Sequence, residues 1–123
     1  MPKIYSLPTS NGSDTLTDLK NDLLKQHKVS LVERVAYVIA LLEKYGFQIN
    51  QNYKNNTIKK LDKELYELRT NDIRIFLYYD GFDLFVLLHG FIKKTQKTPI
   101  NEIRKAKKEI NGWKMIKQEV WSA

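Results

Sequence analysis

The sequence predicts an α+β domain: two N-terminal helices packed on a mainly antiparallel twisted sheet, followed by a C-terminal helix. Through residues 13–45, apolar side chains recur at the spacing of one helix face. Between residues 57 and 91, runs rich in β-branched and aromatic residues alternate with short turn signals. No helical segment separates these runs, so neighbouring strands are expected to pair as hairpins. The length of 123 residues fits one core, and residues 1–123 are predicted to form a single domain.

Two helices are predicted before the sheet. The first opens at Ser13-Asp14 and buries one apolar stripe, which consists of Leu16, Leu19, Leu23 and Leu24. The second is expected to begin at Ser30, because Glu33 three positions later completes a capping box, and to end at Gly46. Its buried face is expected to consist of Leu31, Val35, Val38, Ile39 and Leu42. Residues 48–56, rich in Asn and Gln, are interpreted as a polar loop.

The sheet is predicted from four strands and two tight turns. The strands are expected to cover Thr57–Leu61, Glu64–Arg69, Asp72–Tyr79 and Phe82–Phe91. Asp80-Gly81 is a strong hairpin signal that pairs Tyr79 with Phe82, and a turn at Thr70-Asn71 is expected to pair Leu68 with Ile73. Side-chain alternation then predicts a core face beneath the two helices, made of Tyr66, Leu68, Ile73, Ile75, Leu77, Leu84, Val86 and Leu88.

The opposite face of the predicted sheet is chemically mixed. It consists of Arg69, Arg74, Phe76, Tyr78, Phe85, Leu87, His89 and Phe91. Guanidinium groups bind phosphates and aromatic rings stack on bases, so this mixture suits single-stranded RNA or DNA. Structural roles stay open as well. Glu67 is expected opposite Arg74 and would form a cross-strand ion pair with it. His89 is equally compatible with a hydrogen-bonded structural histidine. The aromatic residues could be covered by the C-terminal helix instead of binding nucleic acid.

A basic segment follows the last strand. An apolar run stops at His89-Gly90, and three lysines come soon after it: Lys93, Lys94 and Lys97. Thr98 and Pro99 are typical of the N-cap and first position of a helix. Ammonium groups beside free helix N–H groups favour an anion such as phosphate. A solubilising charge cluster is the alternative interpretation.

The C-terminal helix is predicted from Pro99 to about Ile110. Its inward face is expected to consist of Ile100, Ile103, Ala106 and Ile110. Asn111-Gly112 is placed to cap or kink this helix. The tail from Trp113 to Trp121 is interpreted as a further short helix or a docking element.

The positive charge of the chain is concentrated in one segment. Residues 90–117 hold nine lysines and arginines against two glutamates, and this surplus equals the net charge of the whole chain, +7. A localised basic stripe is typical of a nucleic-acid binder, and Lys105 and Lys108 are expected to contact phosphates. An acidic protein surface or an anionic membrane would fit the charge as well.

The composition excludes several other classes. The chain has no cysteine, so disulfides and thiol chemistry are excluded. Its two histidines lie far apart and it has no glycine-rich phosphate loop, so no metal and no cofactor are expected. No apolar stretch approaches about 18 residues and the N-terminus lacks a signal-peptide core, so a cytoplasmic protein without a membrane partner is expected.

Three segments together resemble a known family. They are LDKELYELR at 61–69, IRIFLYY at 73–79 and LLHGFIKKTQKTP at 87–99. This combination resembles the phage-derived, HigB-like branch of the RelE/ParE toxin superfamily. The resemblance implies the same order of helices and sheet. It also implies that the chain is the toxin of a type II toxin–antitoxin pair, with a helix-turn-helix antitoxin as its partner.

The resemblance further implies an activity. Toxins of this kind are metal-independent endoribonucleases that cut mRNA on the ribosome, so mRNA and ribosomal RNA are the implied partners. The RNA 2′-hydroxyl attacks the adjacent phosphorus and gives a cyclic phosphate. Two alternatives stay open: a ParE-like toxin, which shares the fold but inhibits DNA gyrase, and a non-catalytic module that binds nucleic acid or an antitoxin.

The resemblance also implies the site residues. Arg69 matches a catalytic arginine, and Lys93 and Lys94 match basic residues at the end of the last strand. His89 matches the histidine of the LLHGF motif and is the candidate general acid or base. The tail lacks the tyrosine on which RelE relies, so Tyr78 or Lys94 is an alternative for proton transfer. The RNA-binding candidates are Arg74, Tyr78, Lys97, Lys105 and Lys108.

Overall fold

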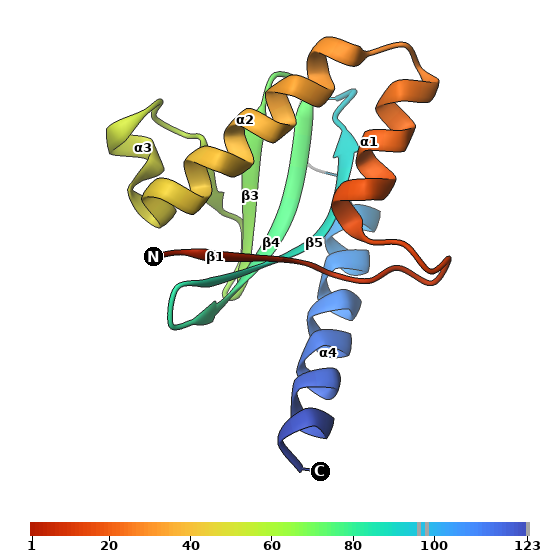
Figure 1. The fold of residues 1–123 in the computed structure, drawn as a ribbon, viewed down its shortest axis with the longest axis vertical. Coiled ribbons are helices and arrows are strands. Elements are labelled where there is room, and N and C mark those ends of the chain that lie inside the picture. Colours follow the sequence, from red (N-terminus) through yellow and green to blue (C-terminus); the bar gives the residue numbers. More distant parts are fainter. Residues whose placement is uncertain (96, 98, 123) are drawn as a thin grey trace.

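The computed structural model describes residues 1–95, 97 and 99–122, and it confirms the α+β class. Five strands form one mixed sheet in the order β1-β5-β4-β3-β2. The strands are β1 (Lys3–Ser6), β2 (Ile58–Lys60), β3 (Leu65–Thr70), β4 (Ile73–Gly81) and β5 (Leu84–Ile92). The helices are α1 (Thr15–Lys25), α2 (Val29–Tyr45), the short α3 (Ile49–Asn52) and α4 (Ile100–Ser122). Figure 1 shows α1 and α2 on one side of the sheet and α4 on the other.

The sheet is buried on both faces, so the domain has two apolar cores. Leu23 of α1 and Leu42 of α2 are fully buried against one face. Ala106 and Ile110 of α4 are buried against the other face, where Phe76 is fully buried. A strand that is covered on both faces reads as a continuous apolar run rather than an alternating one. This double cover explains why residues 84–88 show no alternation in the sequence.

The β3–β4 turn lies one residue later than the sequence predicts. Thr70 pairs with Ile73, so the turn consists of Asn71 and Asp72 rather than Thr70-Asn71. Asn71 adopts a left-handed φ of 52°, which asparagine tolerates better than most residues. The correction moves the pairing by two residues, and an even shift leaves every side chain on its predicted face. Arg69 and Arg74 therefore share one face, directly opposite each other.

The β4–β5 turn is formed by Phe82 and Asp83, and the prediction of Asp80-Gly81 is wrong. Gly81 pairs with Leu84, which leaves only these two residues in the loop. Phe82 and Asp83 have φ values of 50° and 60°, as the two-residue turn of a twisted hairpin requires. The Tyr79 hydroxyl accepts a hydrogen bond from the Asp83 N–H at 3.0 Å. A phenylalanine at positive φ is uncommon, so residue preference pointed to the wrong dipeptide.

Two irregularities in this hairpin change which face part of β5 presents. The register shifts at two points along β4, and each shift places an extra residue in one strand. Phe85 and Leu87 consequently pack with the N-terminal helices, whereas Leu84, Val86 and Leu88 pack with α4. The prediction had these five side chains on the reverse faces. From residue 89 on, after the second shift, β5 again presents its predicted faces.

The N-terminal strand β1 was not expected from the sequence. It pairs in parallel with β5, which makes the sheet mixed. Thr15 at the start of α1 donates a hydrogen bond from its Oγ1 to the Leu88 carbonyl at 2.8 Å, and this contact ties the chain after β1 to the sheet. Four residues are too few to show a pattern by themselves. By pairing with β5, this strand satisfies backbone N–H and C=O groups that an open sheet edge would leave unpaired.

Two features of the region around α2 correct the sequence-based prediction. The helix begins at Val29 with Lys28 at its N-cap, and no side chain caps it, so the capping box at Ser30 is wrong. The polar segment 48–56, expected to be a loop, contains the end of a 3-10 turn and the helix α3. Short polar helices of this kind lack the apolar periodicity that sequence patterns detect.

Helix α4 runs through Asn111 and Gly112 without interruption, so the predicted cap or kink there is wrong. Glycine inside a helix costs about 1 kcal/mol relative to alanine. Packing on both sides of this position offsets that cost, because Ile110 is buried on the sheet and the Trp113 ring lies 5.1 Å from that of Tyr5. Ile100, expected to face inward, is 66% exposed. The predicted N-cap Thr98 lies outside the described residues.

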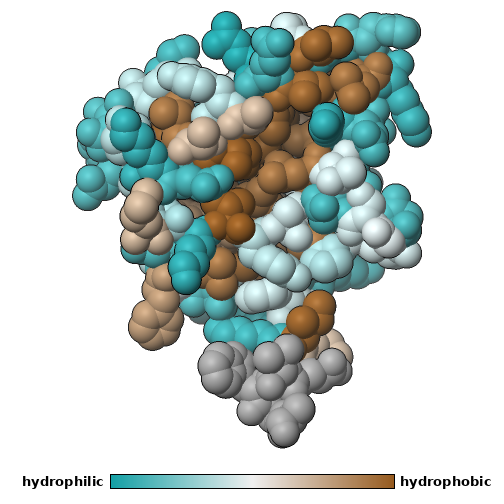
Figure 2. Space-filling model, in the orientation of Figure 1, coloured by the Kyte–Doolittle hydropathy of each residue, from teal (hydrophilic) through white to brown (hydrophobic). Residues whose placement is uncertain are grey.

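An apolar hollow remains between α1 and α2. Figure 2 shows hydrophobic side chains gathered there. The hollow is lined by Leu16, Lys20, Leu23, Val32, Val35, Ala36 and Ile39. In the part of the chain that the structure describes, no helix is both long and apolar enough to cross a lipid bilayer.

Asp14 fixes the start of α1 and supports a first test. Its Oδ1 accepts hydrogen bonds from the Thr17 N–H at 3.0 Å and from the Ser6 hydroxyl at 2.8 Å, and these bonds hold the pKa of the carboxyl below its ordinary value of 3.8. Asp14→Ala is expected to lower the free energy of unfolding by about 1 kcal/mol at neutral pH. Asp14→Asn, an equally good N-cap, is expected to change it little.

The stability of the wild-type protein and that of the Asp14→Asn variant should respond differently to acid. The folded carboxyl titrates below the unfolded one, so its stabilisation is complete above about pH 4 and is lost as the pH falls through the folded pKa. The wild-type protein should therefore lose this contribution on acidification, and Asp14→Asn should not. Urea unfolding at neutral pH and near pH 3 measures the difference. Identical acid sensitivity of the two proteins would contradict the role of the Asp14 carboxylate.

Candidate functional site

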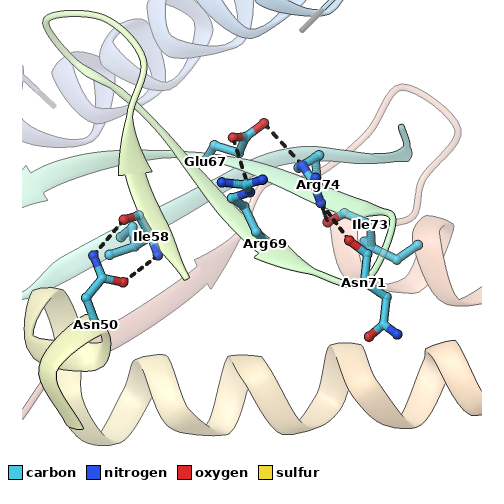
Figure 3. Close-up of polar contacts among 7 residues, drawn as sticks. All are labelled: Asn50, Ile58, Glu67, Arg69, Asn71, Ile73 and Arg74. Carbon is cyan, nitrogen blue, oxygen red and sulfur yellow. Dashed lines mark hydrogen bonds and ion pairs between the residues drawn. The ribbon is translucent and has the colours of Figure 1, made fainter. Parts of the chain in front are cut away.

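Three charged side chains from β3 and β4 meet at one end of the sheet. Glu67 and Arg69 are two residues apart on β3, and Arg74 lies opposite Arg69 on β4, so all three project from the same face. The Glu67 carboxylate lies between the guanidinium groups, 3.9 Å from Arg69 Nε and 3.6 Å from Arg74 Nε (Figure 3). Glu67 is 3% exposed, so its charge is compensated by the two arginines rather than by water.

Arg74 is held in place by the β3–β4 turn. Its Nη1 donates to the carbonyl oxygens of Asn71 and Ile73, at 2.8 Å and 3.0 Å (Figure 3). Burial, with the positive charge of Arg69 as a smaller cause, lowers the pKa of the Arg74 guanidinium from its usual value. The sequence-based ion pair between Glu67 and Arg74 is present, although Phe76 and not Arg74 is the direct cross-strand partner of Glu67. Arg74 therefore stabilises the hairpin.

Arg69 differs from Arg74 because part of its side chain reaches solvent. The side chain is 34% exposed, and its Nε lies 3.9 Å from the Glu67 carboxylate. It lines an open pocket of about 350 Å³ together with three other basic residues: Arg34, Lys54 and Arg74. The remaining lining is polar or aromatic and consists of Tyr53, Asn55, Asn56, Thr57, Thr70 and Asn71. We name this cavity the Arg69 pocket; its charge suits an anion.

One wall of the Arg69 pocket is a loop that is bonded to the sheet. The Asn50 side chain brackets Ile58, donating to its carbonyl and accepting from its N–H, both at 2.9 Å (Figure 3). The Arg69 N–H donates to the Thr57 carbonyl at 2.8 Å, and the Thr57 hydroxyl donates to the Lys54 carbonyl at 2.7 Å. These bonds hold the loop before β2 beside the end of β3.

His89 lies elsewhere, between β5 and α4. Its Nδ1 contacts the Glu109 carboxylate, and its Nε2 lies 3.7 Å from Glu102 Oε1. The residue is 6% exposed, and its ring packs against Phe76 with the centroids 5.4 Å apart. It lines a second cavity of about 640 Å³ with Lys105 and Glu109, and the Arg69 pocket does not include it. The structure thus separates two residues that the resemblance places in one site.

The predicted lysines lie along the β5–α4 connection and on α4. Lys93 is partly exposed, and its N–H donates to the Asp72 carbonyl at 2.7 Å, so it lies at the same end of the sheet as Arg69 with β4 between them. It does not line the Arg69 pocket. The other predicted lysines are exposed: Lys94, Lys97, Lys105 and Lys108.

Part of the basic segment is used to hold α4 on the sheet. Three of its lysines form ion pairs of 2.7–2.8 Å: Lys107 with Asp62, Lys114 with Glu64, and Lys117 with Asp80. Lys114 Nζ also lies 5.5 Å from the centre of the Tyr78 ring. Burial, followed by the nearby charge of Asp80, raises the pKa of Tyr78. The candidate Tyr78 therefore lies among these pairs and not in the Arg69 pocket.

Sequence reasoning missed three residues of this site. Glu67 was considered only as a partner of Arg74, and its contact with Arg69 depends on the true register. Arg34 and Lys54 are distant from Arg69 in the sequence, and neither belongs to a motif. No local signal predicts their approach.

Comparison with known protein families agrees with the fold described above. The helix–helix–sheet–helix arrangement is compatible with a RelE-like toxin fold. The family model described as phage-derived protein Gp49-like (DUF891) matches residues 22–111. The chain therefore belongs to the Gp49-like family, whose members are RelE-like toxins associated with toxin–antitoxin systems. Among curated proteins, no match was found.

The contacts of His89 support a stability test. His89→Ala removes the partner of two carboxylates and leaves a cavity beside Phe76, so the free energy of unfolding is expected to fall by on the order of 2 kcal/mol. The matched control is His27→Asn, because His27 is exposed and asparagine tolerates its positive φ. Urea unfolding of both variants measures the effect. Equal, small effects would show that the contacts of His89 with α4 do not stabilise the domain.

Proposed function

We propose that this protein is the toxin of a type II toxin–antitoxin pair, of the HigB-like branch, and that it cuts mRNA on the ribosome. Membership in the Gp49-like family supports a toxin with an antitoxin partner. The observation that carries the nuclease proposal is the partly exposed Arg69 in a pocket with three further basic residues. A ribosomal target implies a cytoplasmic protein, and a helix-turn-helix antitoxin is the proposed partner.

The proposed reaction is an internal phosphoryl transfer. The RNA 2′-oxygen bonds to the adjacent phosphorus, the bond to the 5′-oxygen breaks, and the products are a 2′,3′-cyclic phosphate and a 5′-hydroxyl. A base takes the proton from the 2′-hydroxyl, and an acid gives one to the leaving oxygen. Negative charge builds up on the phosphorane oxygens, where a fixed cation lowers the barrier. Arg69 is suited to that role because its side chain is partly exposed and lines the pocket, while its Nε lies 3.9 Å from the Glu67 carboxylate.

The positions of the other candidates support different roles. His89 is buried under α4, Tyr78 is partly buried, and Lys94 is exposed, so Lys94 is the proposed proton-transfer group. Lys93 lies at the same end of the sheet and is proposed to bind the scissile region. Arg74 acts through the turn that it clamps. The exposed residues Lys97, Lys105 and Lys108 are proposed to contact RNA of the ribosome.

One observation favours a second candidate function. His89 is held by α4 and is separate from the Arg69 pocket, so the candidate catalytic set is not assembled in one cavity. A toxin of this family that binds its target without cutting RNA, as a ParE-like gyrase inhibitor or a binding module, fits this division. Induced expression followed by mapping of mRNA ends separates the two candidates, since only the nuclease leaves new 5′-hydroxyl ends.

Substitution of Arg69 tests the catalytic role. Arg69→Ala is expected to slow single-turnover cleavage of ribosome-bound mRNA by about 10²-fold or more, because it removes a cation that acts on transition-state charge. Ribosome binding should change far less. Arg69→Lys keeps the charge but loses the planar fork, and an intermediate rate is expected. Cleavage by Arg69→Ala at the wild-type rate with saturating toxin would end the proposal for this residue.

Chelation tests the type of chemistry. The proposed reaction relies on fixed cations and proton transfer, so cleavage is expected to persist after the toxin is treated with EDTA and returned to ribosomes with their own magnesium. An untreated sample of toxin is the control. If the treated toxin no longer cleaves mRNA, and adding Mn²⁺ or Mg²⁺ back to the toxin restores cleavage, the protein is a metal-dependent nuclease instead.

A further inference from the structure

The Arg69 pocket has a second wall whose charges the proposed reaction does not use. Arg34 comes from the solvent side of α2, and Lys54 comes from the loop before β2. Both side chains are exposed, and neither forms an ion pair with any residue that the structure describes. Lys54 Nζ lies 5.3 Å from the centre of the Tyr53 ring. Two unpaired cations thus face the arginine of the opposite wall.

The charge of this pocket is not balanced from within. Among the described residues that line it, four are basic and none is acidic. Glu67, which lies near both Arg69 and Arg74, is buried and does not line the pocket. In contrast, Lys107, Lys114 and Lys117 on α4 each have a carboxylate partner. Burial and the repulsion by Arg69 lower the pKa of the Arg74 guanidinium, although the charges of Glu67 and Asp72 act in the opposite direction.

The pocket is also largely preformed. Backbone and side-chain hydrogen bonds fix the loop that carries Lys54, and the Arg74 clamp fixes the turn on the other side. A preformed site loses less conformational entropy when a ligand binds. The volume of about 350 Å³ falls in the range that holds a small organic ligand, which is enough for one nucleotide unit.

We propose that Arg34 and Lys54 form a phosphate subsite beside Arg69, which binds the backbone of single-stranded RNA. That the polymer is RNA rests on the proposed function. The contacts with its phosphates rest on the geometry and charge of the pocket. The RNA would enter along the end of the sheet near Lys93 and Lys94 and cross the end of β3. It would then pass between α2 and the loop before β2. The subsite adds affinity and register, while Arg69 acts on the reacting phosphate.

Binding of a short RNA that cannot be cleaved tests this subsite. The probe is a fluorescent single-stranded oligonucleotide with 2′-O-methyl groups, and fluorescence anisotropy is measured over a range of salt concentrations. Arg34→Gln and Lys54→Gln are each expected to weaken binding about 3- to 10-fold at about 0.1 M salt. Each should also reduce the slope of log K against log salt by about 0.7, the value for one phosphate contact on a single strand.

Lys44→Gln is the matched control. It removes one exposed positive charge from α2, the same helix as Arg34, but Lys44 does not line the pocket. It should change the affinity less than 2-fold. The three side chains are exposed, so all three variants are expected to keep the thermal midpoint of the wild type, which is measured alongside.

The outcomes separate the subsite from the nuclease proposal. If Lys44→Gln weakens binding as much as the pocket variants do, overall charge drives binding and the subsite is refuted. Wild-type binding by both pocket variants would refute it as well, even if the toxin cleaves mRNA. If the pocket variants bind weakly but the wild-type protein leaves mRNA intact on ribosomes, the subsite stands and the nuclease proposal fails. Equal affinity for single-stranded DNA would extend the ligand to polynucleotides in general.

Discussion

Strands β4 and β5 are buried on both faces, and this burial governs how the other elements are arranged around them. These strands are apolar on either side, so helices must cover both faces, α1 and α2 on one and α4 on the other. A charged group in this central region is stable only with a partner, because burial without one is costly. Glu67 therefore lies between two arginines, and His89 lies against carboxylates of α4. Arg69, by contrast, lies near the end of β3, where part of its side chain reaches solvent.

The way in which α4 is attached to the sheet changes how the basic segment after the last strand is interpreted. This helix is mostly polar, and few of its apolar residues reach the sheet, so ion pairs supplement its packing. Lys107, Lys114 and Lys117 are used in this way, and their charges are compensated within the domain. Part of the positive charge after residue 89 is therefore neutralised within the protein. The surface that can bind nucleic acid there is less positive than the sequence alone indicates. Meanwhile Arg34 and Lys54, from the nearly neutral first part of the chain, face an open pocket.

The candidate site shows which residues a local pattern can and cannot reveal. Strand alternation predicted Arg69 and Arg74 on one face, and the structure confirms this placement. The prediction holds despite the wrong turn because an even shift in register leaves each side chain on its face. Glu67 was visible as a possible partner of one arginine only, since its place between both follows from the true pairing. His89 was considered both as a structural and as a catalytic residue. Its contacts with Glu102 and Glu109 became apparent only when α4 was placed against β5.

The α+β class, the N-terminal helices, the existence of two hairpins and the start of the first helix at Ser13-Asp14 could all be predicted from the sequence. These features depend on periodicities of 2 and 3.6 residues and on hydrogen bonds between near neighbours, which a local pattern encodes. The positions of the turns, the bulges that reverse part of β5 and the parallel strand β1 became apparent only in the folded structure. An apolar run that is covered on both faces carries no alternation, so packing between distant segments fixes its register. The same long-range packing brings Arg34, Lys54 and Arg69 around one pocket.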